Sequence, residues 1–118
     1  MSDEDDKPVQ RRRYYRLPYP EDAQPPFRDH DGRSYPVLEL SEKSVVIAPA
    51  EGETWAKGDP VSGEILFSDG ESETISGEVL RQDSRGVVVL LSDGVTFHHV
   101  IKEQTFVKKH YPLFLRHR

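Results

Sequence analysis

The chain of 118 residues contains no cysteine, which excludes disulfides, thiol nucleophiles and thiolate metal sites. It also lacks a long hydrophobic run. The longest, Gly86–Leu91, has the length of a strand, whereas a helix that crosses a bilayer needs about 18 apolar residues. The first residues are acidic, unlike the basic and then apolar start of a secretory signal. We therefore expect a cytoplasmic protein that does not insert into membranes.

The length fits one domain. Nine prolines and eight glycines are spread along the chain, which favours many short strands joined by turns over a helix bundle. Asp31-Gly32 and Asp69-Gly70 are hairpin signals, and Asp83–Gly86 is a turn. Alternating or β-branched segments predict six strands, over Phe27–His30, Ser34–Ser41, Ser44–Ala48, Val61–Ser68, Thr74–Arg81 and Val87–Leu91.

The hydrophobic period changes near the C-terminus. Apolar residues at Phe97, Val100, Ile101, Val107 and Tyr111 lie on one face of a helix over about 97–111. Thr96 is the expected N-cap and Pro112 the expected stop. The predicted organisation is a disordered acidic segment at 1–10, a flexible arginine arm at 11–20, a barrel over about 23–92, this helix, and a basic tail at 113–118.

The arm is the strongest candidate for function. Residues 11–16 read Arg-Arg-Arg-Tyr-Tyr-Arg, in which only Arg12 and Arg16 are two arginines standing four apart. A guanidinium group binds phosphate oxygens in pairs, matches the O6/N7 edge of guanine, and stacks on purine rings. The net charge of −5 disfavours nucleic acid as a partner. We therefore expect one small anion, such as a cyclic dinucleotide.

A second polar stretch, Glu39-Leu-Ser-Glu-Lys-Ser44, follows one hairpin later. Glu39 and Ser41 are two apart, so the alternation of a strand places them on the same side. A carboxylate can accept hydrogen bonds from the N1–H and amino group of guanine, or orient an arginine, and a serine hydroxyl can donate to a phosphate or a base.

At these two stretches the chain resembles PilZ domains. Gln10–Pro18 resembles the RxxxR signature of that family, and Glu39–Ser44 resembles its second signature, (D/N)xSxxG. The resemblance covers about residues 10–112. It implies a mainly β fold, a six-stranded antiparallel PilZ-type β-barrel with a C-terminal helix, which binds the bacterial second messenger cyclic di-GMP without catalysis or a cofactor and signals to a protein partner. The implied ligand contacts are Arg12, Arg16, Glu39, Ser41 and Ser44, with Arg11 and Arg13 as additional candidates.

Two positions depart from the family pattern. Glu39 stands where Asp or Asn is usual, and Ser44 stands where Gly is usual. If the backbone there requires a positive φ, serine costs about 1 kcal/mol. Some family members with altered motifs act only through protein partners, and such a module is the alternative prediction. A small nucleic-acid-binding barrel is a third, which the net charge disfavours.

We expect neither a metal site nor an enzyme. His98 and His99 are adjacent, so they would not share a helix face, and His30 and His110 are far away in the sequence. Asp69, Asp83 and Asp93 precede Gly or Ser and are interpreted as turn residues. The sequence contains no phosphate-binding glycine loop, nucleophile elbow or acid pair of a known kind.

Overall fold

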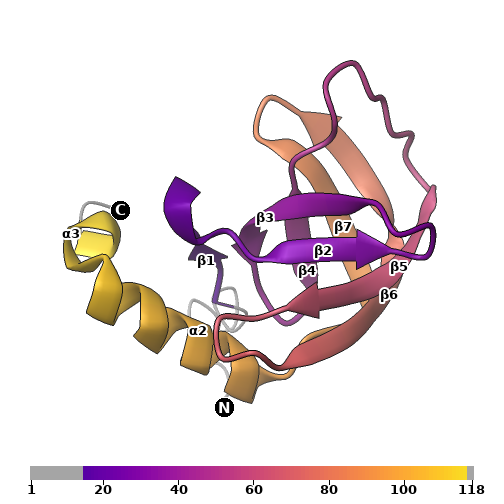
Figure 1. The fold of residues 1–118 in the computed structure, drawn as a ribbon. Coiled ribbons are helices and arrows are strands. Elements are labelled where there is room, and N and C mark those ends of the chain that lie inside the picture. The colour runs from indigo at the N-terminus through magenta and orange to yellow at the C-terminus, as the bar shows by residue number, and fades with distance from the viewer. Residues whose placement is uncertain (1–14, 117–118) are drawn as a thin grey trace, which may run out of the picture.

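The computed structural model describes residues 15–116. The acidic segment 1–10 and the candidate residues Arg11, Arg12 and Arg13 therefore lie outside the described residues. Seven strands, with a 3₁₀ turn between the first two, are followed by two α-helices (Figure 1). The strands are β1 Leu17–Pro18, β2 Pro26–Asp29, β3 Ser34–Leu40, β4 Ser44–Ile47, β5 Pro60–Leu66, β6 Ser72–Asp83 and β7 Gly86–Asp93, and the helices are the 3₁₀ turn η1 Glu21–Ala23, α2 Phe97–His110 and α3 Pro112–Arg116.

Six of the strands form a closed antiparallel barrel. They pair in the order β3-β2-β5-β6-β7-β4, and β4 returns to pair with β3. This arrangement confirms the predicted six-stranded antiparallel β-barrel followed by a helix. The short strand β1 was not predicted. It pairs with the end of β3 that β2 leaves free, through Leu17 opposite Leu40 and Pro18 opposite Glu39.

The predicted turns form for local reasons. Gly32 and Gly70 have φ of +84° and +88°, a region that glycine adopts without a steric penalty. In each hairpin an aspartate on the N-terminal side of the glycine accepts a hydrogen bond from a backbone N–H group. Asp29 accepts from Arg33, and Asp69 accepts from Glu71. These two hairpins join β2 to β3 and β5 to β6.

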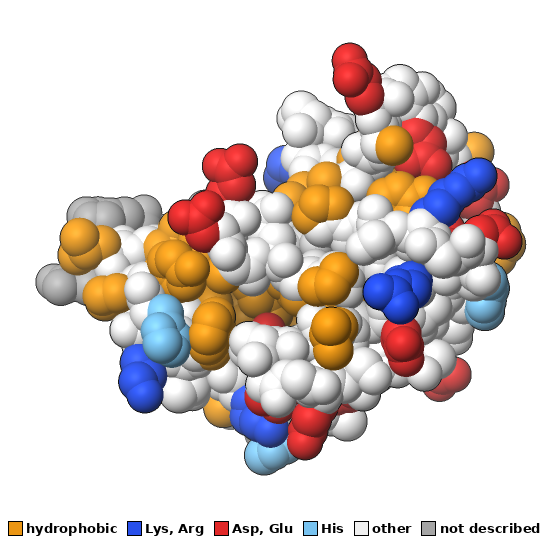
Figure 2. Space-filling model, viewed as in Figure 1, with side chains coloured by type: hydrophobic (Ala, Val, Ile, Leu, Met, Phe, Trp, Pro, Cys, Tyr) orange, Lys and Arg blue, Asp and Glu red, His pale blue; other side chains and the backbone are white. Residues whose placement is uncertain are grey.

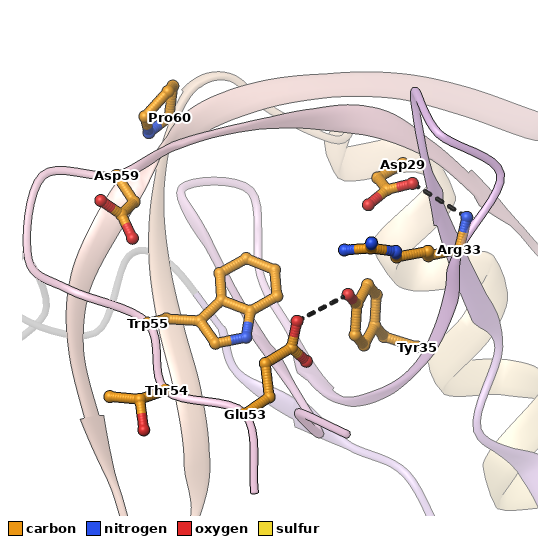
Figure 3. A pocket seen from close by; sticks show the side chains of 8 residues that line it. All are labelled: Asp29, Arg33, Tyr35, Glu53, Thr54, Trp55, Asp59 and Pro60. Carbon is orange, nitrogen blue, oxygen red and sulfur yellow. Dashed lines mark hydrogen bonds between the residues drawn. The ribbon is translucent and has the colours of Figure 1, made fainter. Parts of the chain in front are cut away.

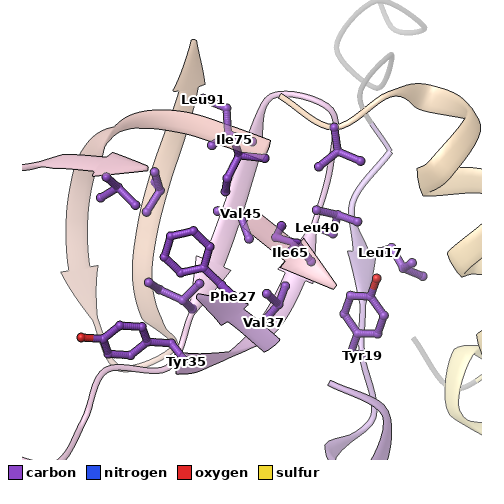
Figure 4. Packing of buried hydrophobic residues seen from close by; sticks show 14 of the residues in the cluster. Leu17, Tyr19, Phe27, Tyr35, Val37, Leu40, Val45, Ile65, Ile75 and Leu91 are labelled. Atoms are coloured by element: carbon purple, nitrogen blue, oxygen red, sulfur yellow. The ribbon is translucent and has the colours of Figure 1, made fainter. Parts of the chain in front are cut away.

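The barrel interior is filled mainly by β-branched residues around two aromatic rings (Figure 4). Phe27 and Tyr35 stack with ring centroids 6.5 Å apart. Burying side chains of this size contributes about 1.5–3 kcal/mol each, so the interior is the main source of the barrel's stability. The buried members include Val37, Leu40, Val45, Ile47, Ile65, Ile75, Val79, Val87 and Val89.

A bulge in β3 changes which side chains enter the barrel. The pairing with β4 shifts register between Val37 and Glu39. Tyr35 and Val37 are buried as predicted, but the next buried residue is Leu40. Strict alternation along the strand would have placed Glu39 on the face of Tyr35 and Val37, but the extra residue of the bulge shifts the alternation. Glu39 instead lies on the outer face.

Helix α2 begins at the predicted N-cap, where the Thr96 hydroxyl accepts from the His99 N–H. Val100 and Val107 are buried as expected, but Phe97 is 53% exposed and Ile101 is also exposed. The buried face instead includes His99 and Glu103. Periodicity of apolar residues missed these two because their burial depends on polar partners in the barrel. None of the helices among residues 15–116 is long and apolar enough to cross a membrane.

The chain turns after α2 rather than ending in a tail. Pro112 begins the short helix α3, so residues 113–116 of the segment interpreted as a basic tail are helical. Phe114 and Leu115 are half-buried and pack against the core. Figure 2 shows hydrophobic side chains gathered where the helices meet the barrel.

One buried carboxyl group joins three parts of the fold. Glu103 of α2 is 1% exposed. Its Oε1 accepts from the Tyr19 hydroxyl at 2.8 Å, and its Oε2 accepts from the hydroxyl and backbone N–H of Ser68, at 2.5 and 3.2 Å. Burial, followed by the nearby Glu103 carboxyl, raises the pKa of Tyr19 well above its usual range. The helix, the segment after β1 and the β5–β6 hairpin are thus tied at one point.

We expect Tyr19→Phe to lower the free energy of unfolding by about 1–3 kcal/mol, because Glu103 would lose a hydrogen-bond donor inside the protein. The measurement is urea denaturation followed by circular dichroism. Tyr35→Phe is the matched control, since the Tyr35 hydroxyl bonds to the partly exposed Glu53. An equal or larger loss in the control would contradict the importance of the Glu103 contact.

Candidate functional site

Strand β1 brings the two predicted motifs together. Leu17 and Pro18 pair antiparallel with Leu40 and Glu39. The residue before Leu17 is Arg16, and the residue after Leu40 is Ser41, so these two residues follow directly at the same end of the ladder. Arg16 belongs to the first motif and Ser41 to the second, although Ser41 lies 25 positions after Arg16 in the chain.

The same pairing puts Arg16 and Glu39 on one face. Leu17 and Leu40 are fully buried in the barrel interior. Successive side chains of a strand point to opposite faces, so the neighbours Arg16 and Glu39 lie on the outer face. Arg16 is exposed and Glu39 is half-buried. An exposed cation and a carboxyl group therefore share a surface at the end of the β1–β3 ladder.

Ser41 lies in the turn between β3 and β4, beyond the end of β3. It is 2% exposed. Its Oγ accepts from the backbone N–H groups of Lys43 and Ser44, at 3.2 and 3.1 Å, and lies 3.0 Å from the Ser44 Oγ. The alternation that placed Ser41 beside Glu39 ends with the strand, and the hydroxyl is turned toward its own turn.

Ser44 fits its position without backbone strain. Among the described residues no amino acid other than glycine has a positive φ, so Ser44 adopts an ordinary conformation as the first residue of β4. Its carbonyl accepts from the Ser41 N–H at 2.9 Å. A glycine is therefore not required here for backbone geometry, and the side chain of Ser44 is half-buried beside Ser41.

A groove of about 390 Å³ lies next to this corner. Its charged lining residues are Glu39 and Arg85, and its apolar walls include Pro18, Leu38, Val46 and Phe114. Arg85 comes from the β6–β7 turn, which the sequence indicated only as a turn. No local signal pointed to it, because β4 and β7 must pair before Arg85 can approach the groove beside Glu39.

The turn that carries Ser41 and Ser44 is held in place by β7 and by the segment that follows it. The N–H of Leu91 in β7 donates to the Lys43 carbonyl at 2.9 Å. A Cβ placed on Gly94 would lie 1.9 Å from the Glu42 carbonyl oxygen, so the segment leading to α2 approaches the turn too closely for any other residue. Gly94 is thus a positioning residue for the second motif.

Another cavity, of about 290 Å³, opens between the β2–β3 hairpin and the β4–β5 loop (Figure 3). Trp55 packs edge-on against Tyr35 there, with ring centroids 5.4 Å apart, so the only tryptophan covers the barrel mouth. The backbone N–H of Ala50 is the main cause that lowers the pKa of Glu53, and burial is the main cause that raises that of Tyr35. The cavity is lined by three carboxyl groups and one guanidinium group, those of Asp29, Glu53, Asp59 and Arg33. This excess of negative charge disfavours an anionic ligand.

The structure thus gathers Arg16, Glu39, Ser41 and Ser44 at one corner of the barrel, while Arg11, Arg12 and Arg13 lie outside the described residues. No protein-family model matches the chain, and no curated protein matches it either. The class that the fold defines is a closed six-stranded antiparallel barrel with C-terminal helices.

We expect Gly94→Ala to displace the β3–β4 turn, because its methyl group overlaps the Glu42 carbonyl oxygen. The substitution should lower the free energy of unfolding by about 1–3 kcal/mol, as overpacking does. Urea denaturation measures the loss. Asp93→Ala, at the exposed neighbouring position, is the control and should change stability by less than about 0.5 kcal/mol. Equal effects of the two substitutions would show that the close approach is unimportant.

Proposed function

We propose that this chain is a non-catalytic receptor for cyclic di-GMP, of the kind its resemblance to PilZ domains implies. The observation that carries the proposal is the β1–β3 ladder, which sets Arg16 next to the stretch Glu39–Ser44. The two stretches were singled out independently in the sequence. Their meeting at one corner of the barrel is what a two-part ligand site requires.

The chemistry of the corner suits a guanine dinucleotide. Arg16 can donate two parallel hydrogen bonds to a phosphate or to the O6/N7 edge of guanine. Glu39, half-buried on the same face, can accept from the N1–H and amino group of a guanine. Arg85, across the groove from this ladder, supplies a second cation for a phosphate.

In this proposal the arm containing Arg12 and Arg16 closes over the bound ligand. Phosphates and guanines then bridge the arm to the outer face of β3. The ordered arm forms a new surface, and a change in that surface is the output to a protein partner. Tyr19 anchors the base of the arm to Glu103, so the movement is confined to residues before β1.

The first experiment is calorimetric titration of the full chain with cyclic di-GMP, with GTP and cyclic di-AMP as controls. Saturable binding that is selective for cyclic di-GMP, at about micromolar Kd or tighter, supports the proposal and gives the stoichiometry. The absence of heat at high ligand concentration would refute it.

We expect Arg12→Ala and Arg16→Ala each to weaken cyclic di-GMP binding at least about tenfold, because each removes charge-assisted contacts worth about 1.5–3 kcal/mol. Arg28→Ala, at an exposed arginine on β2, makes the same change in charge and should leave the affinity unchanged. Unchanged affinity in either arm variant would show that the site is assigned to the wrong residues.

One observation favours a second candidate, a barrel that acts only through protein partners. The hydroxyl of Ser41 is buried and already engaged within its turn, with Ser44 Oγ 3.0 Å away. A ligand could use this hydroxyl only after the turn rearranged. The side chain of Ser44 is therefore what distinguishes the two candidates.

Calorimetry of Ser44→Gly separates them. If the natural chain does not bind cyclic di-GMP and Ser44→Gly does, the partner-only module is correct. If the natural chain binds, we expect the substitution to change its affinity by less than about tenfold, because Ser44 has an ordinary backbone conformation. Ser92→Gly, at an exposed serine of β7, controls for the general effect of adding a glycine to a strand.

A further inference from the structure

A second polar cluster lies where the β5–β6 hairpin meets the first turn of α2, apart from the corner described above. His99 of α2 is 5% exposed. Its ring stacks on Phe67, with centroids 4.2 Å apart. Three carboxyl groups of the hairpin surround it: Asp69, Glu71 and Glu73.

One nitrogen of the His99 ring is fully accounted for. Nδ1 lies 2.5 Å from Glu73 Oε2. Glu73 is itself held by Thr96, whose hydroxyl donates to Oε2 at 2.9 Å and whose N–H donates to Oε1 at 3.1 Å. A carboxylate oxygen only accepts, so Nδ1 carries a proton, and Nε2 is the nitrogen left to bind a metal ion.

The other nitrogen has no hydrogen bond. His99 Nε2 is buried and without a hydrogen-bond partner within the described residues. It nevertheless faces two carboxyl groups, with Asp69 Oδ2 at 3.4 Å and Glu71 Oε1 at 3.6 Å. A buried polar atom without a hydrogen-bond partner requires an explanation. A bound metal ion that takes Nε2 as a ligand would be such an explanation.

The spacing of the three atoms fits a metal ion. His99 Nε2 and the oxygens of Asp69 and Glu71 all lie within 4.8 Å of one another. Zinc binds imidazole nitrogen and carboxylate oxygen at about 2.0–2.2 Å in a tetrahedron, so neighbouring ligand atoms are about 3.3–3.5 Å apart. The two distances from Nε2 are close to this range before any adjustment.

We propose that His99, Asp69 and Glu71 form a zinc site, with Nε2 and one oxygen from each carboxylate as ligands. Glu73 then acts through its bond to Nδ1, which fixes the ring and increases the basicity of Nε2. Three protein ligands leave a fourth position for water. The ion would bridge the hairpin to α2 and so fasten the helix to the barrel.

Lys102 competes with the ion. Its ammonium group lies 2.6 Å from Asp69 Oδ2 and 3.6 Å from Glu71 Oε1, so it offsets one of the two negative charges in the absence of metal. Zinc must displace this ion pair, which lowers the affinity of the site. Removing the lysine charge should therefore strengthen zinc binding, whereas a site that did not involve Asp69 and Glu71 would not respond.

The sequence offered little sign of this site. Asp69 and Glu71 flank a turn glycine, and His99 lies 28 positions after Glu71. The adjacent pair His98-His99 led to the correct conclusion that the two histidines do not share a face, but the ligands of His99 come from another element. The earlier expectation of no metal rested on sequence spacing alone.

The test is titration of the full chain with zinc chloride after treatment with a chelator, by calorimetry and by competition with a chromophoric chelator. We expect one zinc per chain at about micromolar Kd, a Tm that rises with zinc concentration, and no such effect of magnesium. Glu71→Gln should weaken binding at least about tenfold without disturbing the fold, because Glu71 is 65% exposed. Lys102→Met should tighten it.

Matched controls separate this site from other histidines and acids. His98→Asn, next to His99 but exposed, and Glu78→Gln, exposed in the other half of β6, should leave zinc affinity unchanged. Absence of saturable binding to the natural chain would overturn the proposal. So would zinc binding that survives both Glu71→Gln and Asp69→Asn, because the ion would then belong to other side chains.

Discussion

The arrangement of the C-terminal helices on the barrel depends on the buried carboxyl group of Glu103. A barrel of this size can close by strand pairing alone, but α2 has no strand partner and needs specific contacts to hold it in one position. Glu103 favours one position, because a carboxyl group inside the protein must be hydrogen-bonded, and Tyr19 and Ser68 provide its donors among residues 15–116. The apolar contacts of Val100 and Val107 bury hydrophobic area, but the hydrophobic effect is not directional and does not select one orientation of the helix. Together with the bonds of Thr96 and His99 to Glu73, this polar contact fixes the position of the helix on the barrel.

The two proposed binding sites both lie close to residues that the Glu103 contact holds in place. Tyr19 lies three residues after Arg16, so the bond to Glu103 holds the segment that presents the arm to β3. Ser68 begins the turn that carries Asp69 and Glu71, and His99 lies one helical turn before Glu103. A single carboxyl group thus positions the base of the proposed nucleotide site on one side and the proposed zinc ligands on the other. The two sites are nevertheless chemically separate, since they share no residue.

Particular residues show where sequence reasoning succeeds for the site and where it fails. That the arginine stretch and Glu39–Ser44 belong to one site was expected from their resemblance to the two PilZ signatures. The face of β3 on which the Glu39 side chain lies was not predictable, because the bulge at Val37–Glu39 depends on pairing with β4. Arg85 was taken only for a turn residue, and Gly94 for the residue after a turn aspartate. Their roles come from neighbours that lie more than thirty positions away in the chain, Glu39 and Glu42 respectively.

The sequence by itself determined the number of barrel strands, their turns and the start of α2. These depend on interactions between near neighbours: alternation with a period of two, aspartate and glycine in the hairpins, and a threonine N-cap. Only the tertiary structure decided that the arginine stretch and Glu39–Ser44 meet at the β1–β3 ladder, that Glu39 faces outward, and that His99 faces Asp69 and Glu71. The physical reason is that these contacts join residues distant in the chain. They require either the strand pairing of the barrel or the packing of α2 against it.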